Sequence, residues 1–340
     1  MNEPLLAAAV AVTLLFAFIN GLHDGGNVIA TIVSSRSMEP RKAVALGALG
    51  ELAGALLLGT AVARTVAARI LNPELLQGLG GRDLHLLIIG AVGAAIAWNL
   101  FTWVLRLPSS SSHALIGGLL GAGWVTLGHT AIVPGEVLKT VVAPLFLAPL
   151  VGLPAGFLVF SALRTWFGQA HTGIRHFFVA LQTPSVLFLA ATQGSNDSQK
   201  AMGVIAMALA AAEASFPGDR SLPLWVVAGC GTALALGMWA GGWRIVKTVG
   251  YNIFRMQPAH SFSSQFAAAS IIACASLLGG PVSTSQVVAS SVMGVGASRR
   301  LSAVRWSLAR NIMNAWIVTI PLSGLLGAGA CWVLIQILVR

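Results

Sequence analysis

Gly21-Leu22-His23-Asp24 returns 173 residues later as Gly194-Ser195-Asn196-Asp197, and both stretches lie within long apolar segments. A carboxylate in apolar surroundings is costly, so its presence there calls for a functional or structural reason. Repetition at one fixed offset indicates a chain built from two related halves, an arrangement common in secondary transporters. The sequence therefore predicts two membrane-embedded repeats, over 1–165 and 174–340.

A second motif, rich in hydroxyl groups, repeats at the same offset. Pro108-Ser109-Ser110-Ser111-Ser112-His113 aligns with Pro281-Val282-Ser283-Thr284-Ser285-Gln286. The proline lies 84 positions after the acid in both halves. Because two separate motifs keep one spacing, each half is expected to carry an acid and a hydroxyl cluster at matching places.

The composition indicates a membrane protein. Hydrophobic residues make up 56% of the 340 residues and charged residues only 9%, with a mean hydropathy of +0.83. Soluble domains carry about 25% charged residues, so we expect an all-α integral membrane protein. The net charge of +10 does not indicate a nucleic-acid partner, because no basic block with interleaved aromatic residues accompanies it. It is typical of Lys and Arg at helix ends.

Ten apolar segments could cross a bilayer. The first of each half is interrupted by its acidic motif. The fourth of each half is short and starts at the Pro-Ser motif, so it either crosses or re-enters. We therefore expect about ten transmembrane segments in two inverted five-segment repeats, with broken or re-entrant helices. The segments are 5–35, 43–63, 84–106, 111–128 and 137–162, then 177–213, 222–243, 261–279, 284–297 and 307–338.

Basic residues concentrate in every second connection between the apolar segments. Applying the positive-inside rule to these connections places both termini outside the cytoplasm. An odd number of passes per half would invert the second half relative to the first, which is the geometry that alternating access requires. The residues that carry this argument include Arg36, Arg41, Lys42, Arg164, Arg175, Arg299, Arg300 and Arg305.

Asp24 and Asp197 are the acids most suited to hold a coupling cation. Neighbouring glycines such as Gly25 and Gly194 predict a loosened helix that frees backbone carbonyl groups. Carboxylate, amide and carbonyl oxygens together suit Na⁺ or a proton. The alternative is a hydrogen-bonded clamp between helices, which two symmetric acids make less favourable. The candidate coupling-cation residues are His23, Asp24, Asn27, Asn196 and Asp197, with Asp24 and Asp197 as metal ligands if Na⁺ is bound.

The hydroxyl clusters are candidates for anion binding. Each follows a proline and opens an apolar helix, so hydroxyl groups and free backbone amides gather at the positive end of a helix dipole. Such an end binds an oxyanion without a full positive charge. Plain capping of a short helix is the alternative, but capping needs one hydroxyl, not three or four. The candidate anion-binding residues are Ser109, Ser110, Ser111, Ser112, Ser283, Thr284 and Ser285.

Five further polar residues are weaker candidates. Lys200 could neutralise an anion or simply pair with Asp197. His113 and Gln286 occupy matching positions and could reach a ligand or a helix interface. Glu51 is an intramembrane acid without an acidic counterpart at the repeat offset, so its role as a coupling group is an open alternative. Asn20 completes this set.

At this point the motifs resemble a known family. Phe18-Ile19-Asn20-Gly21-Leu22-His23-Asp24 looks like the first signature of the inorganic phosphate transporter (Pit) family, and Gln193–Gly203 looks like its second. Pro281–Ser285, Met293–Ala297 and Val304-Arg305-Trp306 also match. The resemblance spans the whole chain and is to the compact bacterial branch, which lacks a large central hydrophilic loop.

The resemblance implies symport of inorganic phosphate with a cation in a bacterial inner (plasma) membrane. Members of the compact branch are typically coupled to protons and can carry a neutral metal–phosphate complex, whereas other members use Na⁺. By the same similarity, the acidic motifs hold the cation and the Ser/Thr clusters hold phosphate. Family members can dimerise, so a homodimer is allowed, and no cofactor is implied.

Two departures from the family pattern bear on the substrate and the coupling ion. His23 stands where many members have Asn, which is compatible with proton coupling. Gln286 stands where His is usual, so a sulfate or other tetrahedral-oxyanion permease of the same fold remains the alternative. Buried acceptors such as Asp24 and Asp197 favour phosphate, because near neutral pH phosphate can donate a hydrogen bond and sulfate cannot.

Two other protein classes are less consistent with the sequence. An intramembrane hydrolase could use His23 and Asp24, but no HExxH, GxSxG or Cys/His metal spacing accompanies them. An open channel does not need a pair of matched, symmetric sites. We therefore expect a transporter and not an enzyme.

Overall fold

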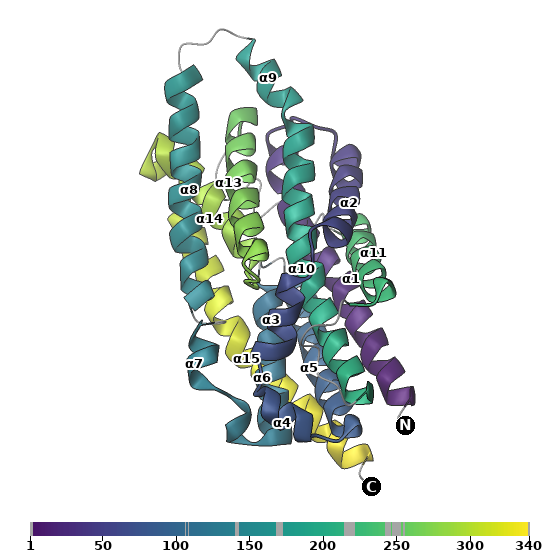
Figure 1. Cartoon of the computed structure of the whole chain (residues 1–340). Helices are drawn as coiled ribbons and strands as arrows, with labels where there is room; N and C mark the ends of the chain where they lie inside the picture. Colours follow the sequence, from purple (N-terminus) through teal and green to yellow (C-terminus); the bar gives the residue numbers. More distant parts are fainter. Residues whose placement is uncertain are drawn as a thin grey trace.

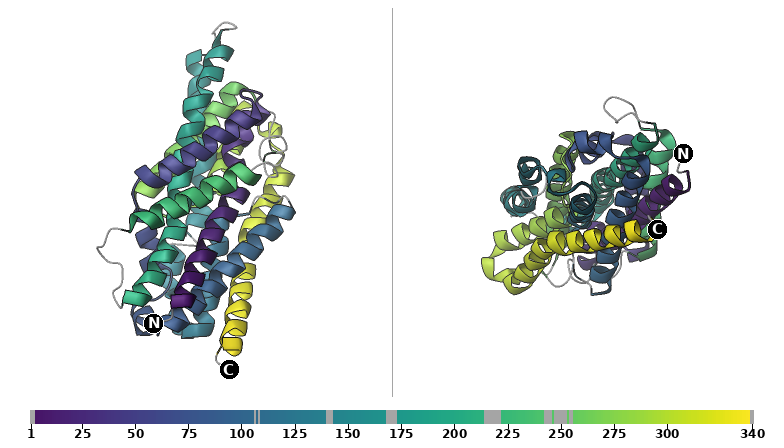
Figure 2. Two further views of the ribbon diagram at one scale, coloured as in Figure 1. Left: turned by 90° about the vertical axis from the view of Figure 1, so that its right-hand side faces the viewer. Right: turned by 90° about the horizontal axis from the view of Figure 1, so that it is seen from below.

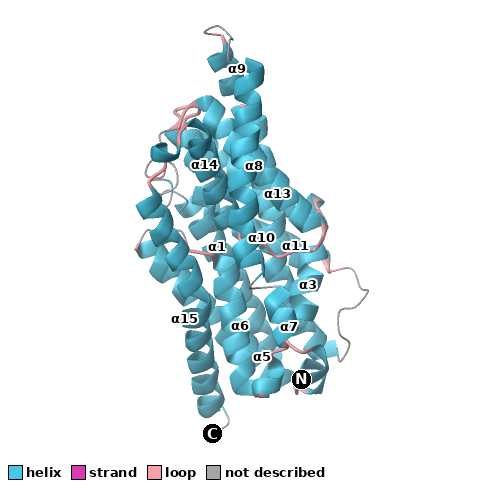
Figure 3. Cartoon of the chain, turned by 90° about the vertical axis from the view of Figure 1, so that its left-hand side faces the viewer, coloured by secondary structure: helices cyan, strands magenta, loops and turns pink. Residues whose placement is uncertain are grey.

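The computed structural model describes residues 3–105, 107, 109–139, 143–167, 173–213, 222–241, 246, 253 and 256–338. Within these residues the chain is helical with no strand (Figure 3), which confirms the all-α prediction. Pro108, part of the predicted anion motif, and the expected segment ends at 106 and 243 lie outside the described residues.

The first half of the chain contains one long helix, a bent pair, and three further long or medium helices. Its elements are α1 (Glu3–Ser34), α2 (Pro40–Leu57), α3 (Ala61–Arg69), α4 (Pro73–Gly78), α5 (Gly81–Val104), α6 (Ser111–Leu127), η1 (His129–Ala131), α7 (Pro134–Val137) and α8 (Ala143–Phe167). The rest comprises α9 (Ile174–Ala180), α10 (Gln182–Glu213), α11 (Leu224–Gly241), α13 (Pro258–Leu277), α14 (Thr284–Arg299), η4 (Leu301–Ala303) and α15 (Trp306–Leu338).

Six helices of the described part are long and apolar enough to cross a membrane, or up to seven if the bent pair α2 and α3 forms one span. These two helices meet at an angle of 72°. The predicted number of ten crossings is therefore not confirmed. α6 and α14 have 17 and 16 residues, at or below the roughly 17 residues that a crossing helix needs.

The outer surface of the bundle is apolar. Leu57 is 78% exposed, Leu325 70% and Trp239 61%, whereas acidic and amide side chains of the two motifs are buried. A soluble protein shows the reverse arrangement, since large exposed apolar areas favour association with lipid or other apolar surfaces. This distribution fits a protein embedded in a bilayer.

The helices pack mainly against helices from the other end of the chain. α1 packs along α11 and α10 along α2, while α6 packs along α15 and α14 along α8. The repeat offset reappears at helix ends: α5 and α13 end at Val104 and Leu277, and α6 and α14 begin at Ser111 and Thr284. Matched elements thus make matched contacts.

The two acidic-motif helices run in opposite directions. α1 starts at the lower end of the molecule, where both termini lie, and α10 starts beside α9 at the upper end and descends (Figure 1). Figure 2 also shows the N- and C-termini at one end. α1 and α10 pack against each other, so the two acids are carried by adjacent helices of opposite direction.

The predicted helix break at the acidic motifs is wrong. α1 continues through Gly21–Gly26, and α10 continues through Gly194. The glycines serve close packing instead: a Cβ on Gly21 would lie 1.9 Å from the carbonyl oxygen of Leu234, and one on Gly194 would lie 2.3 Å from that of Glu51. Small residues allow such close approach of membrane helices. The sequence alone does not distinguish glycines that permit close packing from glycines that loosen a helix.

Candidate functional site

The start of each short helix contacts one acid. At the first turn of α6, the Ser111 hydroxyl donates a hydrogen bond to the Asp24 carboxylate on α1. At the first turn of α14, the Thr284 hydroxyl donates to Asp197 Oδ2 on α10 at 3.0 Å. All four side chains are buried. The two pairs correspond to each other at the repeat offset, so the same polar contact is built twice.

The two hydroxyl motifs also contact each other. Ser112 Oγ donates to the backbone oxygen of Val282 at 3.2 Å, and Ser285 Oγ donates to that of Ser109 at 3.0 Å. These bonds are again equivalent at the repeat offset. Because each motif bonds the other, the starts of α6 and α14 lie together, and their positive dipole ends act on one region.

Helix capping accounts for only part of the hydroxyl groups. Ser110 is the N-cap of α6, and its side chain accepts a hydrogen bond from the backbone of His113. Ser283, the N-cap of α14, makes no such bond and instead lies 3.1 Å from Ser285 Oγ. The capping alternative therefore holds for Ser110 and not for the cluster as a whole.

Among the described residues, the Asp24 carboxylate contacts His23, Asn27 and Ser111 and no lysine or arginine. His23 Nδ1 lies 2.9 Å from Asp24 Oδ1, and Asn27 Nδ2 donates to the same oxygen at 3.3 Å. The other ring nitrogen of His23 lies 3.1 Å from Thr102 Oγ1 and 3.2 Å from Ser109 Oγ. A proton or cation bound at Asp24 would thus act directly on the hydroxyl cluster of α6.

The surroundings of Asp197 contain a fixed cation. Lys200 Nζ lies 2.5 Å from Asp197 Oδ1 and from Ser112 Oγ, and 2.9 Å from the backbone oxygen of Val282. The three acceptors use all three donors of an ammonium group. Lys200 occupies the position that Asn27 holds in the first half, so the two acid sites differ in charge.

Several predicted residues join this network and several do not. Asn196 turns toward α13, where Nδ2 donates to Ser276 Oγ at 2.8 Å and to the oxygen of Gly280 at 3.1 Å. Among the described residues, both side-chain polar atoms of Asn20, Glu51 and Gln286 lack a hydrogen-bond partner, as do Asn27 Oδ1, Asn196 Oδ1 and His113 Nδ1. Buried polar atoms are rarely unpaired, so these groups are exceptions within the described part of the chain.

The two carboxylates also interact across the site. Asp24 and Asp197 lie within electrostatic range of each other, and the fully buried carboxyl group of Glu51 lies within range of both. Oxygen donors of this kind suit a proton or a hard monovalent cation. Within the described part of the chain, no three His, Cys, Asp or Glu side chains gather as a metal cluster.

Sequence reasoning missed three residues of the network. Thr102 contacts His23 and lies 2.8 Å from Ser109 Oγ. Gln193 Nε2 donates to the backbone oxygen of Asp24 at 3.1 Å, and Ser276 accepts from Asn196. Gln193 aligns with Asn20 at the repeat offset, so the repeat itself could have identified it. Thr102 and Ser276 carry no comparable signal.

Comparison with known proteins gives one consistent result. The sequence pattern described as "Phosphate transporter family" matches residues 20–327. A "Probable low-affinity inorganic phosphate transporter" of Bacillus subtilis is 39% identical over 326 residues, covering 96% of each chain. A protein of the same name from Rhizobium meliloti is 40% identical, covering 96% of this chain and 95% of its own.

A solved structure shares the fold. The structure titled "The sodium-dependent phosphate transporter" superimposes with a TM-score of 0.85 at 22% sequence identity, covering 98% of this chain and all of the other. At that identity the likeness concerns the arrangement of helices.

Proposed function

This chain belongs to the phosphate transporter family, and on that premise we propose that it is a secondary symporter that carries inorganic phosphate across the membrane with a coupling cation. Its relatives are transporters and not enzymes. The names of the bacterial relatives refer to inorganic phosphate, and the sulfate alternative has no support among them.

The observation that carries the proposal is the matched pair of hydroxyl–carboxylate contacts. Ser111 with Asp24 and Thr284 with Asp197 bring each hydroxyl cluster against one acid. We assign the anion to the starts of α6 and α14, where hydroxyl groups and helix dipoles favour an oxyanion. Ser109, Ser110, Ser112, Ser283 and Ser285 complete the phosphate-binding set.

The same arrangement favours phosphate over sulfate. Phosphate near neutral pH carries a proton and can donate it to a carboxylate or carbonyl oxygen. Sulfate carries only acceptors, so it would leave such oxygens facing like charge. The unpaired oxygens of Asn27 and Asn196 add further acceptors to this environment.

For the coupling cation, the difference between Asn27 and Lys200 is the main argument. The Lys200 ammonium already supplies a cation to Asp197, so Asp197 has less need of a mobile one. His23, Asp24 and Asn27 then form the site that loads and releases the cation. A buried His–Asp pair can take up a proton, so coupling to H⁺ is favoured and Na⁺ is the alternative.

The two-fold arrangement of the contacts supports a mechanism of alternating access. We propose that 1–165 and 174–340 are inverted repeats of five segments each, with α6 and α14 entering from opposite faces. The opposite directions of α1 and α10 (Figure 1) support this, as do the matched contacts of α6 with α15 and of α14 with α8. Rocking of one repeat against the other would then open the site to each side in turn.

The proposed location is a bacterial inner membrane with both termini outside the cytoplasm. Arg36, Arg41, Lys42, Arg164, Arg175 and Arg299 would then lie on the cytoplasmic side, as the positive-inside rule requires. A homodimer is compatible with this topology.

The test is uptake of labelled phosphate into proteoliposomes of the purified protein under imposed pH or Na⁺ gradients, with excess sulfate as competitor. Uptake driven by a pH gradient and insensitive to sulfate is the expected result. Sulfate uptake without phosphate uptake would overturn the substrate, and uptake that ignores both gradients would overturn symport.

A further inference from the structure

A second basic site lies away from the hydroxyl motifs. A cavity of about 900 Å³ opens at the end of the molecule that carries α9. Its lining includes four arginines from four different segments: Arg36, Arg164, Arg175 and Arg299. Arg36 follows α1, Arg164 lies in the last turn of α8, Arg175 lies in α9, and Arg299 ends α14.

No acid among the described lining residues balances the positive charge in this cavity. None of the described lining residues is Asp or Glu, and none of the four arginines forms a salt bridge within the described part of the chain. His260 lies within electrostatic range of Arg299 and adds no negative charge. Glu39 lines a separate, smaller cavity that Arg36 also borders. Four unpaired guanidinium groups around one cavity create a strong attraction for anions.

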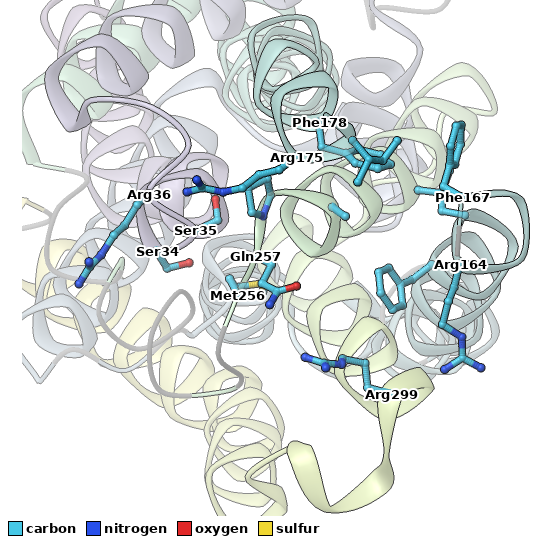
Figure 4. A pocket seen from close by; sticks show the side chains of 15 residues that line it. Ser34, Ser35, Arg36, Arg164, Phe167, Arg175, Phe178, Met256, Gln257 and Arg299 are labelled. Carbon is cyan, nitrogen blue, oxygen red and sulfur yellow. The ribbon is translucent and has the colours of Figure 1, made fainter. Parts of the chain in front are cut away.

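The four arginines contribute to the cavity lining from different sides. Arg175 extends toward Ser35, and Arg299 extends toward Met256 and Gln257, while Arg36 and Arg164 lie at opposite edges with their guanidinium groups turned outward (Figure 4). Ser34, Ser35 and Gln257 add neutral hydrogen-bonding groups, and Phe160, Phe167 and Phe178 add an apolar wall. Guanidinium groups bind phosphate oxygens in a two-pronged geometry.

The backbone conformation of Arg36 is a second indication that its side chain has a role. Its φ angle is +54°, and it is the only residue other than glycine with a positive φ in the described part of the chain. This position directly follows α1, where glycine is usual because the left-handed conformation costs other residues roughly 1–2 kcal/mol. Arg36 holds this conformation at that cost and lines the edge of the cavity.

We propose that this cavity binds an anion that carries several phosphate-type groups and is larger than the transported ion. A volume of about 900 Å³ is near the upper end of the roughly 300–1,000 Å³ found for sites of drug-sized ligands. A single phosphate ion would leave most of the arginines without a partner. The ligand is either a soluble polyphosphate-type anion or the headgroup of an anionic lipid.

Occupancy of the site is expected to slow transport, a consequence that rests on the proposed function. α1 carries Asp24 and reaches the cavity at Ser34, about 15 Å further along its axis. α14 carries Thr284 at its start and Arg299 at its end, roughly 22 Å away. An anion that joins α1, α8, α9 and α14 would hold elements of both repeats together and favour one conformation.

The binding test uses the full-length protein in detergent and two probes. Tripolyphosphate is titrated by calorimetry, and retention of phosphatidylglycerol and cardiolipin is followed by native mass spectrometry. The variant is Arg164→Gln/Arg175→Gln. The matched control is Arg41→Gln/Lys42→Gln, which removes the same charge from exposed positions that line neither cavity.

At least tenfold weaker tripolyphosphate binding in the variant but not in the control would establish a soluble ligand. Loss of lipid retention in the variant alone would establish a lipid headgroup. Equal behaviour of the variant and the control with both probes would overturn the proposal, since only general surface charge would be at work.

The transport test separates this site from the substrate site. Tripolyphosphate or the retained lipid should lower the maximal rate of phosphate uptake at unchanged KM, and the double variant should remove this effect. A raised KM would indicate competition at the hydroxyl motifs and overturn the regulatory role. If the protein bound the anion but carried no phosphate, the proposed function would fail and the binding site would stand.

Discussion

Thr284 donates a hydrogen bond of 3.0 Å to Asp197 from a different helix, and Ser111 repeats this contact with Asp24 in the other half. The relationship ties the start of each short helix to an acid buried in the centre of the bundle. An ion bound at either partner must therefore change the environment of the other. This linkage is what coupled transport of an anion and a cation requires.

Asp24→Asn is expected to abolish gradient-driven phosphate uptake while the protein still folds. The amide keeps the shape of the side chain, and no lysine or arginine among the described residues is left without a partner by the change. Uptake in proteoliposomes and thermal unfolding of the purified variant measure the two effects. Normal coupled uptake would remove Asp24 from the cation site.

Asp197→Asn is expected to damage stability as well as transport. It leaves the Lys200 ammonium buried without its carboxylate partner, and breaking one side of a buried pair costs on the order of 3–5 kcal/mol. The double variant Asp197→Asn/Lys200→Gln should regain much of the lost thermal stability but not transport. If the double variant is no more stable than the single one, the ion pair is not the cause.

Thr284→Ala and Ser111→Ala are expected to raise the apparent KM for phosphate. Hydrogen bonds to charged groups contribute about 1.5–3 kcal/mol, which corresponds to roughly tenfold to a hundredfold in affinity. Ser298→Ala is the matched control, because that hydroxyl bonds only the backbone of its own helix, at 2.8 Å. Equal KM values in all three variants would contradict the assigned anion site.

Lys200→Asn is expected to make transport responsive to an additional cation. The change gives the second acid site the residue that the first site has at Asn27, and it frees Asp197 Oδ1. Uptake should then be stimulated by Na⁺ or show a steeper dependence on the proton gradient. Lys139→Asn serves as the control, because the Lys139 side chain is 75% exposed. Identical ion dependence in the two variants would contradict the proposal that the Lys200 ammonium takes the place of a mobile cation at Asp197.

Gly194→Ala is expected to destabilise the protein strongly, because the added Cβ would lie 2.3 Å from the Cα of Glu51. Backbone atoms cannot move aside as a flexible side chain can. Gly93→Ala is the control: nothing lies within 4 Å of its added Cβ, and removing glycine from a helix interior is favourable by roughly 0.5–1 kcal/mol. Similar melting temperatures for both variants would mean that α2 and α10 pack less tightly at Gly194 than the structure shows.

The helix content and the membrane class could be predicted from the sequence because both depend on composition and on the lengths of apolar segments. Motifs at a fixed offset are also visible along the chain, and they predict matched elements in the two halves. The offset even located the matched starts of α6 and α14 at Ser111 and Thr284.

Only the tertiary structure decided what the repeated residues touch. The glycines beside Asp24 and Asp197 are compatible with helix loosening or with close packing, and only the neighbouring backbones of Leu234 and Glu51 distinguish the two. The different surroundings of Asp24 and Asp197 likewise depend on where the Lys200 side chain reaches. The physical reason is that these contacts join segments far apart in the chain, so they are set by how the helices pack and not by local sequence.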